Sequence, residues 1–178
     1  MTEEAKIVDT GNGLKPAGPG WFVLNAAEAA WGHVEGFGSW CDFQSDHPFE
    51  QIGVNIHILD PGRPNGKYHR EDQQEDFLVL AGKCILIVEG QERRLKPWDF
   101  VHCPPGTDHI FVGAEAPCAI LMIGGRTPQK KITYPVSEVA AKHGASVVTE
   151  TNSPKEAYAG AAKPRVVPTP WPAVLSPP

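Results

Sequence analysis

The segment YHREDQQEDFLVLAG, residues 68–82, places one histidine and four carboxylates directly before an apolar run. His69, Glu71 and Glu75 have the same parity, so on a continuous β-strand their side chains would share one face. Imidazole and carboxylate groups are frequent metal ligands. The segment is either a solvated cluster of charges or a metal site at the mouth of a β-barrel.

A second histidine, His109, follows a tight Pro104-Pro105-Gly106 turn further along the chain. Two histidines and a carboxylate on strands that meet at one end of a barrel would form a metal-ligand set with positions left for substrate or dioxygen. Imidazole suits iron, zinc, nickel and copper, whereas a second carboxylate shifts the preference toward manganese. We therefore expect one divalent metal ion, with Fe(II) as the first choice and Zn, Mn or Ni as alternatives.

The segments that must position these ligands are short, rich in β-branched and aromatic residues, and bounded by glycine and proline. They are residues 21–24, 39–43, 52–59, 76–81, 84–89, 92–96, 99–103, 109–113 and 118–124. Gly90-Gln91 is the expected hairpin turn between two of them. Short strands at regular spacing predict an all-β sandwich or barrel.

Helical signals occur mainly near the end of the chain. Residues 136–144 resemble a short helix closed by glycine, and residues 153–160 begin with serine and proline and end with glycine. Residues 163–178 contain six prolines, so we expect an extended tail rather than a strand or helix, with Trp171 either exposed or docked on a neighbour. The predicted organisation is an N-terminal segment (1–20), a barrel (21–125), a helical extension (126–162) and the tail (163–178).

The spacing of these residues resembles the two motifs of the cupin superfamily. Gly62, His69, Glu75 and Gly82 fit the first motif, and Pro104, Gly106 and His109 fit the second. The second motif begins at position 98, so fifteen residues (83–97) separate the two motifs. The resemblance covers residues 62–113. It implies a cupin-type jelly-roll barrel whose metal is held by His69, Glu75 and His109.

Three positions differ from the usual cupin pattern. Glu71 stands in place of the second histidine, Trp98 in place of a glycine, and Gly113 in place of the final asparagine. Glu71 is a fourth metal ligand, an acceptor for an imidazole N–H, or a catalytic base facing the substrate. The H-x-E-x-x-x-E spacing is similar to that of the 3-hydroxyanthranilate dioxygenases, but the arginines that hold the substrate carboxylate there are not found at Asn65 or Gly113.

Several other residues have two interpretations. His57 is expected to be a satisfied or outward-facing histidine, the alternative being a residue of the barrel pocket. Since His102 and Cys103 alternate along a strand, only one of them can face inward. Phe77, Val79 and Phe111 should form the apolar wall of the pocket, and the Gln129-Lys130-Lys131 cluster is expected to be solvated.

Composition limits the partners and the location. A net charge of −5 argues against nucleic-acid binding, which needs a basic surface. No apolar run approaches the roughly 20 residues of a membrane helix. Four widely spaced cysteines and a polar N-terminus predict a cytoplasmic protein with free thiols. The cupin resemblance further implies a homodimer, with residues 21–24 and the tail as expected contacts.

The sequence thus predicts a metal-dependent enzyme acting on a small organic acid or related metabolite. An oxidoreductase of dioxygenase type is the first expectation, with an isomerase or decarboxylase using the same ion as a Lewis acid. The alternative is a non-catalytic cupin that binds or senses a small molecule.

Overall fold

The computed structural model describes residues 2–170, which form many short strands and two helices of a single turn. The strands are β1 (Lys6–Asp9), β2 (Leu14–Ala17), β3 (Trp31–Val34), β4 (Gly38–Cys41), β5 (Ile52–Leu59), β6 (Arg70–Glu71), β7 (Glu75–Ala81), β8 (Cys84–Val88), β9 (Gln91–Leu95), β10 (Phe100–Cys103), β11 (His109–Gly113), β12 (Cys118–Gly125), β13 (Ile132–Thr133) and β14 (Arg165–Val167). The helices are α1 (Glu138–Ala141) and α2 (Pro154–Ala157), capped by Ser137 and Ser153.

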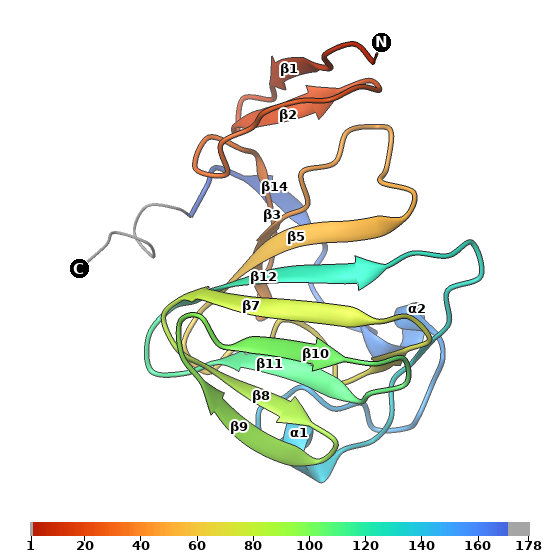
Figure 1. Ribbon diagram of the computed structural model, residues 1–178. Coiled ribbons are helices and arrows are strands. Elements are labelled where there is room, and N and C mark those ends of the chain that lie inside the picture. The colour runs from red at the N-terminus through yellow and green to blue at the C-terminus, as the bar shows by residue number, and fades with distance from the viewer. Residues whose placement is uncertain (1, 171–178) are drawn as a thin grey trace.

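Two sheets of unequal width form the body of the protein (Figure 1). The wide sheet has the strand order β10-β7-β12-β5-β4-β3-β14, and the narrow sheet has the order β11-β8-β9. Within residues 2–170 these sheets do not close into a barrel. The predicted mostly-β fold is confirmed, but the closed barrel is not observed, since three strands cannot cover the full width of seven.

The main core lies between the two sheets. Alternate residues of β7 and β12, among them Phe77, Val79 and Ile120, face Leu86 and Phe111 of the narrow sheet. The opposite face of the wide sheet packs under residues 24–31, where Trp31 is fully buried. Both faces of the wide sheet are therefore covered, which explains the nearly continuous apolar character of β5 and β12.

The strands with clear apolar patterns were predicted well. Residues 52–59 and 109–113 are strands with the predicted bounds, and most of the others differ by one or two residues. Residues 21–24 are not a strand, and only Trp21 forms an isolated bridge, to Glu4. The prediction missed β1, β2, β3, β6, β13 and β14.

The proline-rich tail contains a strand where none was predicted. Residues 165–167 lie between Pro164 and Pro168 and pair with β3 as the edge strand β14. An edge position tolerates flanking prolines because one side of the strand needs no hydrogen bonds. Trp171 lies outside the described residues.

Left-handed backbone in the turns at Glu89-Gly90 and at Trp98 bears on the predictions. The β8–β9 turn is centred on Glu89 and Gly90, with φ of 48° and 71°, rather than on Gly90-Gln91. Trp98, at the position of a cupin glycine, has φ of 74° and is 75% exposed. The backbone at this position therefore has a conformation that glycine favours, while the residue bears a bulky side chain that this conformation disfavours.

Replacing Trp98 should consequently stabilise the fold. We expect Trp98→Gly to raise the free energy of unfolding by about 1 kcal/mol, because glycine adopts positive φ without steric cost. Trp98→Ala keeps that cost and should not stabilise. Guanidinium denaturation of the three proteins measures the difference, and equal stability of the glycine and alanine variants would contradict the strain.

Candidate metal centre

The two motif histidines face each other across an antiparallel bridge. His69 N donates to the carbonyl oxygen of His109 at 3.1 Å, and His109 N donates to that of His69 at 2.8 Å. The ring centroids are 4.9 Å apart. Reciprocal backbone pairing thus places both imidazoles side by side at the same end of the sandwich.

Backbone carbonyls fix the orientation of both rings. His69 Nδ1 is 2.7 Å from the carbonyl oxygen of Lys67, and His109 Nδ1 is 3.0 Å from that of Thr107. Since a carbonyl only accepts, each Nδ1 must carry the proton, which leaves each Nε2 lone pair free. Burial lowers the pKa of His69 to about 3 and also lowers the pKa of His109. Both rings are therefore neutral near pH 7, as metal ligation requires.

Glu75 supplies a carboxylate to the same point. It begins β7 on the inner face of the wide sheet, opposite Cys103 on β10 and Gly124 on β12. Its Oε2 lies 3.5 Å from His109 Nε2. Burial, reinforced by the charge of Glu71, raises the pKa of Glu75 to about 8. A cation at this point would offset the cost of ionising the buried group.

Glu71 lies beside this set but is held by another partner. Its side chain is buried, and Oε1 is 4.0 Å from His69 Nε2. Its Oε2 is 2.5 Å from Lys130 Nζ, an ion-pair contact. Lys130 belongs to the loop after β12, which Asp72 anchors through hydrogen bonds with the backbone of Lys131. The prediction that Lys130 is merely solvated was wrong, because the loop folds back over β6.

Tyr134 closes the site on the side of His69. The residue is buried, with its ring centroid 5.9 Å from that of His69. Burial, together with Tyr158 and Glu71, raises the pKa of its hydroxyl. Tyr134 was not predicted to belong to the site and Lys130 was expected to be solvated, since both lie outside the two motifs and reach the site only through the path of the loop.

The donor atoms of His69, Glu75 and His109 fit a metal ion. One ligand atom from each lies within 4.8 Å of the other two, and Glu71 is not part of this group. Ligand atoms lie about 2.0–2.2 Å from a bound transition metal, so a small inward movement would bring all three onto one ion. Two imidazoles and one carboxylate form the set typical of sites with open coordination positions.

On the side of β7, β10 and β11, the triad is bordered by apolar and unreactive side chains. Phe77 packs 5.1 Å from the His109 ring and 4.7 Å from the Phe111 ring, which confirms the predicted wall. Cys103 faces inward, and burial raises its thiol pKa to about 12. His102 faces outward and pairs with Asp76 at 2.7 Å. Cys103 is therefore a core residue rather than a reactive thiol.

Gly113 occupies the place of the asparagine in the second cupin motif. A Cβ atom at Gly113 would lie 2.2 Å from the carbonyl oxygen of Asp60. This close approach accompanies a hydrogen bond from Gly62 N to the Gly113 carbonyl oxygen at 2.9 Å. The change from asparagine thus follows from the tight packing of the loop after β5, and it does not touch the triad.

Facing sheets with a two-histidine, one-carboxylate set at one end define a β-sandwich protein with a candidate metal-binding site. Residues 55–124 match the family described as the Cupin domain. This match identifies residues 55–124 as a cupin domain. A comparison with curated proteins found no match.

Solved cupin structures are similar to part of the chain. A sugar phosphate isomerase of a cupin superfamily from Silicibacter pomeroyi is 32% identical, with 47% of this chain and 56% of that chain covered and a TM-score of 0.45. A proposed sugar phosphate isomerase from Acidithiobacillus ferrooxidans is 28% identical, with 48% and 57% covered and a TM-score of 0.46. KdgF from Halomonas sp. is 24% identical, with 55% and 88% covered and a TM-score of 0.47. The chain spans little more than half the length of the two isomerase structures.

Removal of one imidazole should abolish metal binding. We expect the wild-type protein to contain close to one metal ion per chain and His109→Ala to contain almost none, because two ligands of a buried site seldom hold an ion. His102→Ala is the matched control, since that histidine is exposed and faces away from the triad. Elemental analysis by ICP-MS measures the ratios, and wild-type protein without metal after reconstitution would contradict the site.

Metal affinity should also increase with pH. Below about pH 8 the Glu75 carboxyl of the metal-free protein holds a proton that the ion must displace, whereas the lowered histidine pKa values add no competing proton. We expect the Co(II) affinity to rise about tenfold per pH unit from about pH 6.5 to 7.5 and to level off above about pH 8. Calorimetric titration in two buffers of different ionisation enthalpy measures the proton release. An affinity independent of pH over this range would show that Glu75 is already ionised.

Proposed function

We propose that this protein is a metal-dependent enzyme that acts on a small organic acid, with dioxygenase-type oxidation as the first reaction to test. The supporting observation is Glu71, a buried carboxylate 4.0 Å from His69 Nε2 that is not among the three clustered donors. A site that only binds a ligand needs no ionisable group beyond its metal ligands. An enzyme that moves protons does.

The residues divide into ligands and proton-handling groups. His69, Glu75 and His109 would hold the ion, and Fe(II) would supply dioxygen chemistry whereas Zn, Mn or Ni would supply Lewis acidity. Glu71 would accept a substrate proton at Oε1, while Lys130 Nζ at Oε2 keeps the carboxylate in place. Phe77, Phe111 and Tyr134 would exclude water from the reacting atoms.

One cationic side chain on the inner face of the wide sheet, Arg126, supports an acidic substrate. Arg126 continues the inner face of β12 two residues after Gly124, which is paired with Glu75. Its guanidinium rests over Gly53, where a Cβ atom would lie 3.0 Å from Nε. Nη1 is fixed by Gln44 Oε1 and the Phe49 carbonyl oxygen, each at 2.7 Å. This pre-oriented cation is suited to a substrate carboxylate.

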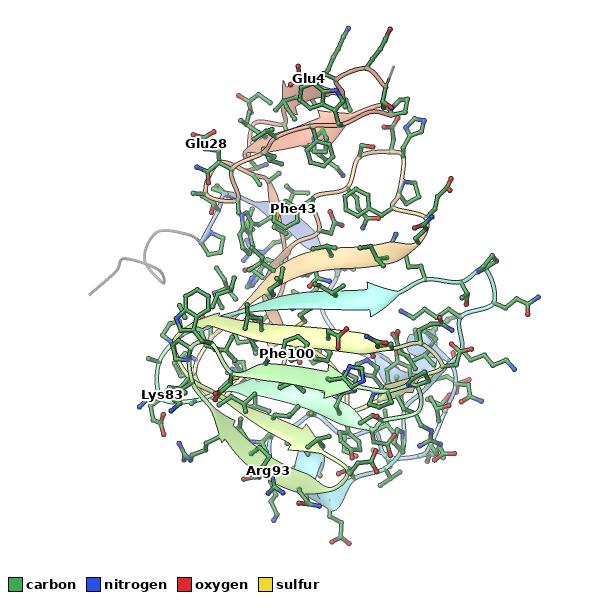
Figure 2. All side chains as sticks on the ribbon, in the orientation of Figure 1. Glu4, Glu28, Phe43, Lys83, Arg93 and Phe100 are labelled. Atoms are coloured by element: carbon green, nitrogen blue, oxygen red, sulfur yellow. The ribbon has the colours of Figure 1, made fainter. Side chains whose placement is uncertain are left out.

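Assembly and location are further parts of the proposal. Phe100, labelled in Figure 2, is 65% exposed on the edge strand β10, and Trp21 is 52% exposed. An unpaired edge with exposed apolar side chains supports a homodimer. The four cysteines are free and buried, as expected for a cytoplasmic protein. Within residues 2–170, no helix has the length and apolar character needed to cross a membrane.

The open coordination positions can be tested without knowing the substrate. Nitric oxide, a stand-in for dioxygen, should give the high-spin nitrosyl EPR signal with Fe(II)-loaded wild-type protein and none with His109→Ala. Oxygen uptake would then be screened with catechol-like and thiol acids. An iron-loaded protein without the nitrosyl signal would exclude the dioxygenase, and lyase or isomerase assays with zinc or manganese would follow.

Glu71→Gln separates the enzyme from the non-catalytic alternative. We expect this variant to retain close to one metal ion per chain while losing about a hundredfold or more of the activity found in the screen. Glu35→Gln is the control, since the Glu35 side chain is 81% exposed. If Glu71→Gln loses the metal instead, Glu71 is a ligand, and if it keeps full activity, the proposed base is wrong.

A further inference from the structure

A second cavity lies on the inner face of the wide sheet, away from the triad. It encloses about 540 Å³, and its lining includes Phe37, Trp40, Asn55, His57 and Tyr158. None of the triad residues lines it. The Tyr158 ring lies 5.9 Å from that of Tyr134, which is itself 5.9 Å from His69, so two tyrosine rings stand between the cavity and the triad.

The unequal widths of the two sheets create this cavity. In the register of the wide sheet, His57 is opposite Ile120 on one side and Trp40 on the other, so all three share the inner face. Ile120 packs in the core between the sheets, whereas His57 and Trp40 lie beyond it. Residues 161–164, together with Asn65 and Tyr158, enclose the space that the narrow sheet leaves uncovered.

Two polar atoms in this lining have no partner. Asn55 Oδ1 and His57 Nδ1 are buried and make no hydrogen bond within residues 2–170. The interpretation of His57 as a satisfied or outward-facing histidine was therefore wrong. Buried polar atoms are nearly always paired, so two such atoms on alternate residues of one strand indicate a group that the protein chain does not supply.

The chemistry of the lining limits what that group can be. An amide oxygen needs a donor, and an imidazole nitrogen needs a donor or an acceptor according to its tautomer. A hydroxyl group satisfies both. Asp42 and Lys163 are the charged side chains of the lining, so their charges cancel. This balance favours a neutral ligand with several hydroxyl groups.

The arrangement of the rings indicates the shape of the ligand. Phe37 meets Tyr158 nearly at a right angle, 76° at 5.5 Å, and Trp40 lies nearly parallel to His57, 20° at 6.1 Å. The first pair is edge-on, and the rings of the second pair stack on each other. Neither pair therefore forms an open slot between parallel rings that would hold a planar heterocycle. Aromatic walls at several angles instead suit a puckered ring with apolar C–H faces.

From these observations we propose that the cavity is a second binding site, for a neutral polyhydroxylated ligand of monosaccharide size. Asn55 and His57 hydrogen-bond its hydroxyl groups, and Phe37, Trp40 and Tyr158 pack against its C–H faces. The site is independent of the metal, since its lining contains none of the three donors.

The test uses the whole 178-residue chain with D-glucose, D-xylose and myo-inositol as probes and sodium benzoate as the charged planar comparison. At least one polyol should raise the melting temperature, and the increase should grow with the polyol concentration. Asn55→Leu and His57→Gln should each lower the affinity for that polyol at least about tenfold, as measured by calorimetric titration. Asn152→Leu, an exposed control, and His109→Ala, which disrupts the metal triad, should bind as the wild type does.

Two results would overturn the proposal. The first is a failure of selectivity, in which none of the polyols binds or benzoate binds more tightly than they do. The other is that Asn55→Leu and His57→Gln bind the polyol unchanged, which would place it elsewhere. Because His109→Ala lacks the metal site, its unchanged polyol binding separates this proposal from the metal-dependent activity.

Discussion

The reciprocal backbone bridge between His69 and His109 is the constraint on which the site depends. It joins the segment before β6 to the start of β11, and so fixes the spacing of two imidazoles that are 40 residues apart in the sequence. The carbonyls of Lys67 and Thr107 then fix both tautomers. Because backbone groups set positions and proton locations, the ligand geometry is formed before any ion arrives, and little conformational freedom remains to be lost on binding.

Charge balance is the second organising feature. Glu75 and Glu71 bring two carboxylates into a buried region, and Lys130 neutralises one of them. The remaining charge resides on Glu75, whose raised pKa reflects its burial and the nearby Glu71. A divalent ion would reverse this situation, since it would favour the ionised carboxylate and bring the local charge closer to neutral. The same two acidic residues that destabilise the metal-free site therefore explain why the site would select a cation.

The sequence predicted the grouping of the candidate ligands better than their surroundings. The periodicity of residues 52–59 and 109–113 and the motif positions of His69, Glu75 and His109 depend on local patterns, and the structure has these strands and brings these side chains together. Lys130 and Tyr134 reach the site because a loop folds back over β6, and no local pattern encodes the path of a loop. The open sandwich and the edge strand β14 were also missed, since sheet width and edge pairing depend on contacts between distant segments. The prediction for His57 was wrong for the same reason. The alternation along the strand puts His57 on the same face as Asn55, but it does not tell whether the other sheet covers that face.

The central claim is that His69, Glu75 and His109 bind one metal ion together. Crystals of reconstituted protein, measured at energies on either side of the metal absorption edge, test it most directly. We predict one anomalous peak within about 2.0–2.3 Å of both Nε2 atoms and of a Glu75 carboxylate oxygen. A peak bound to other residues, or no peak at the triad in metal-loaded crystals, would contradict the account.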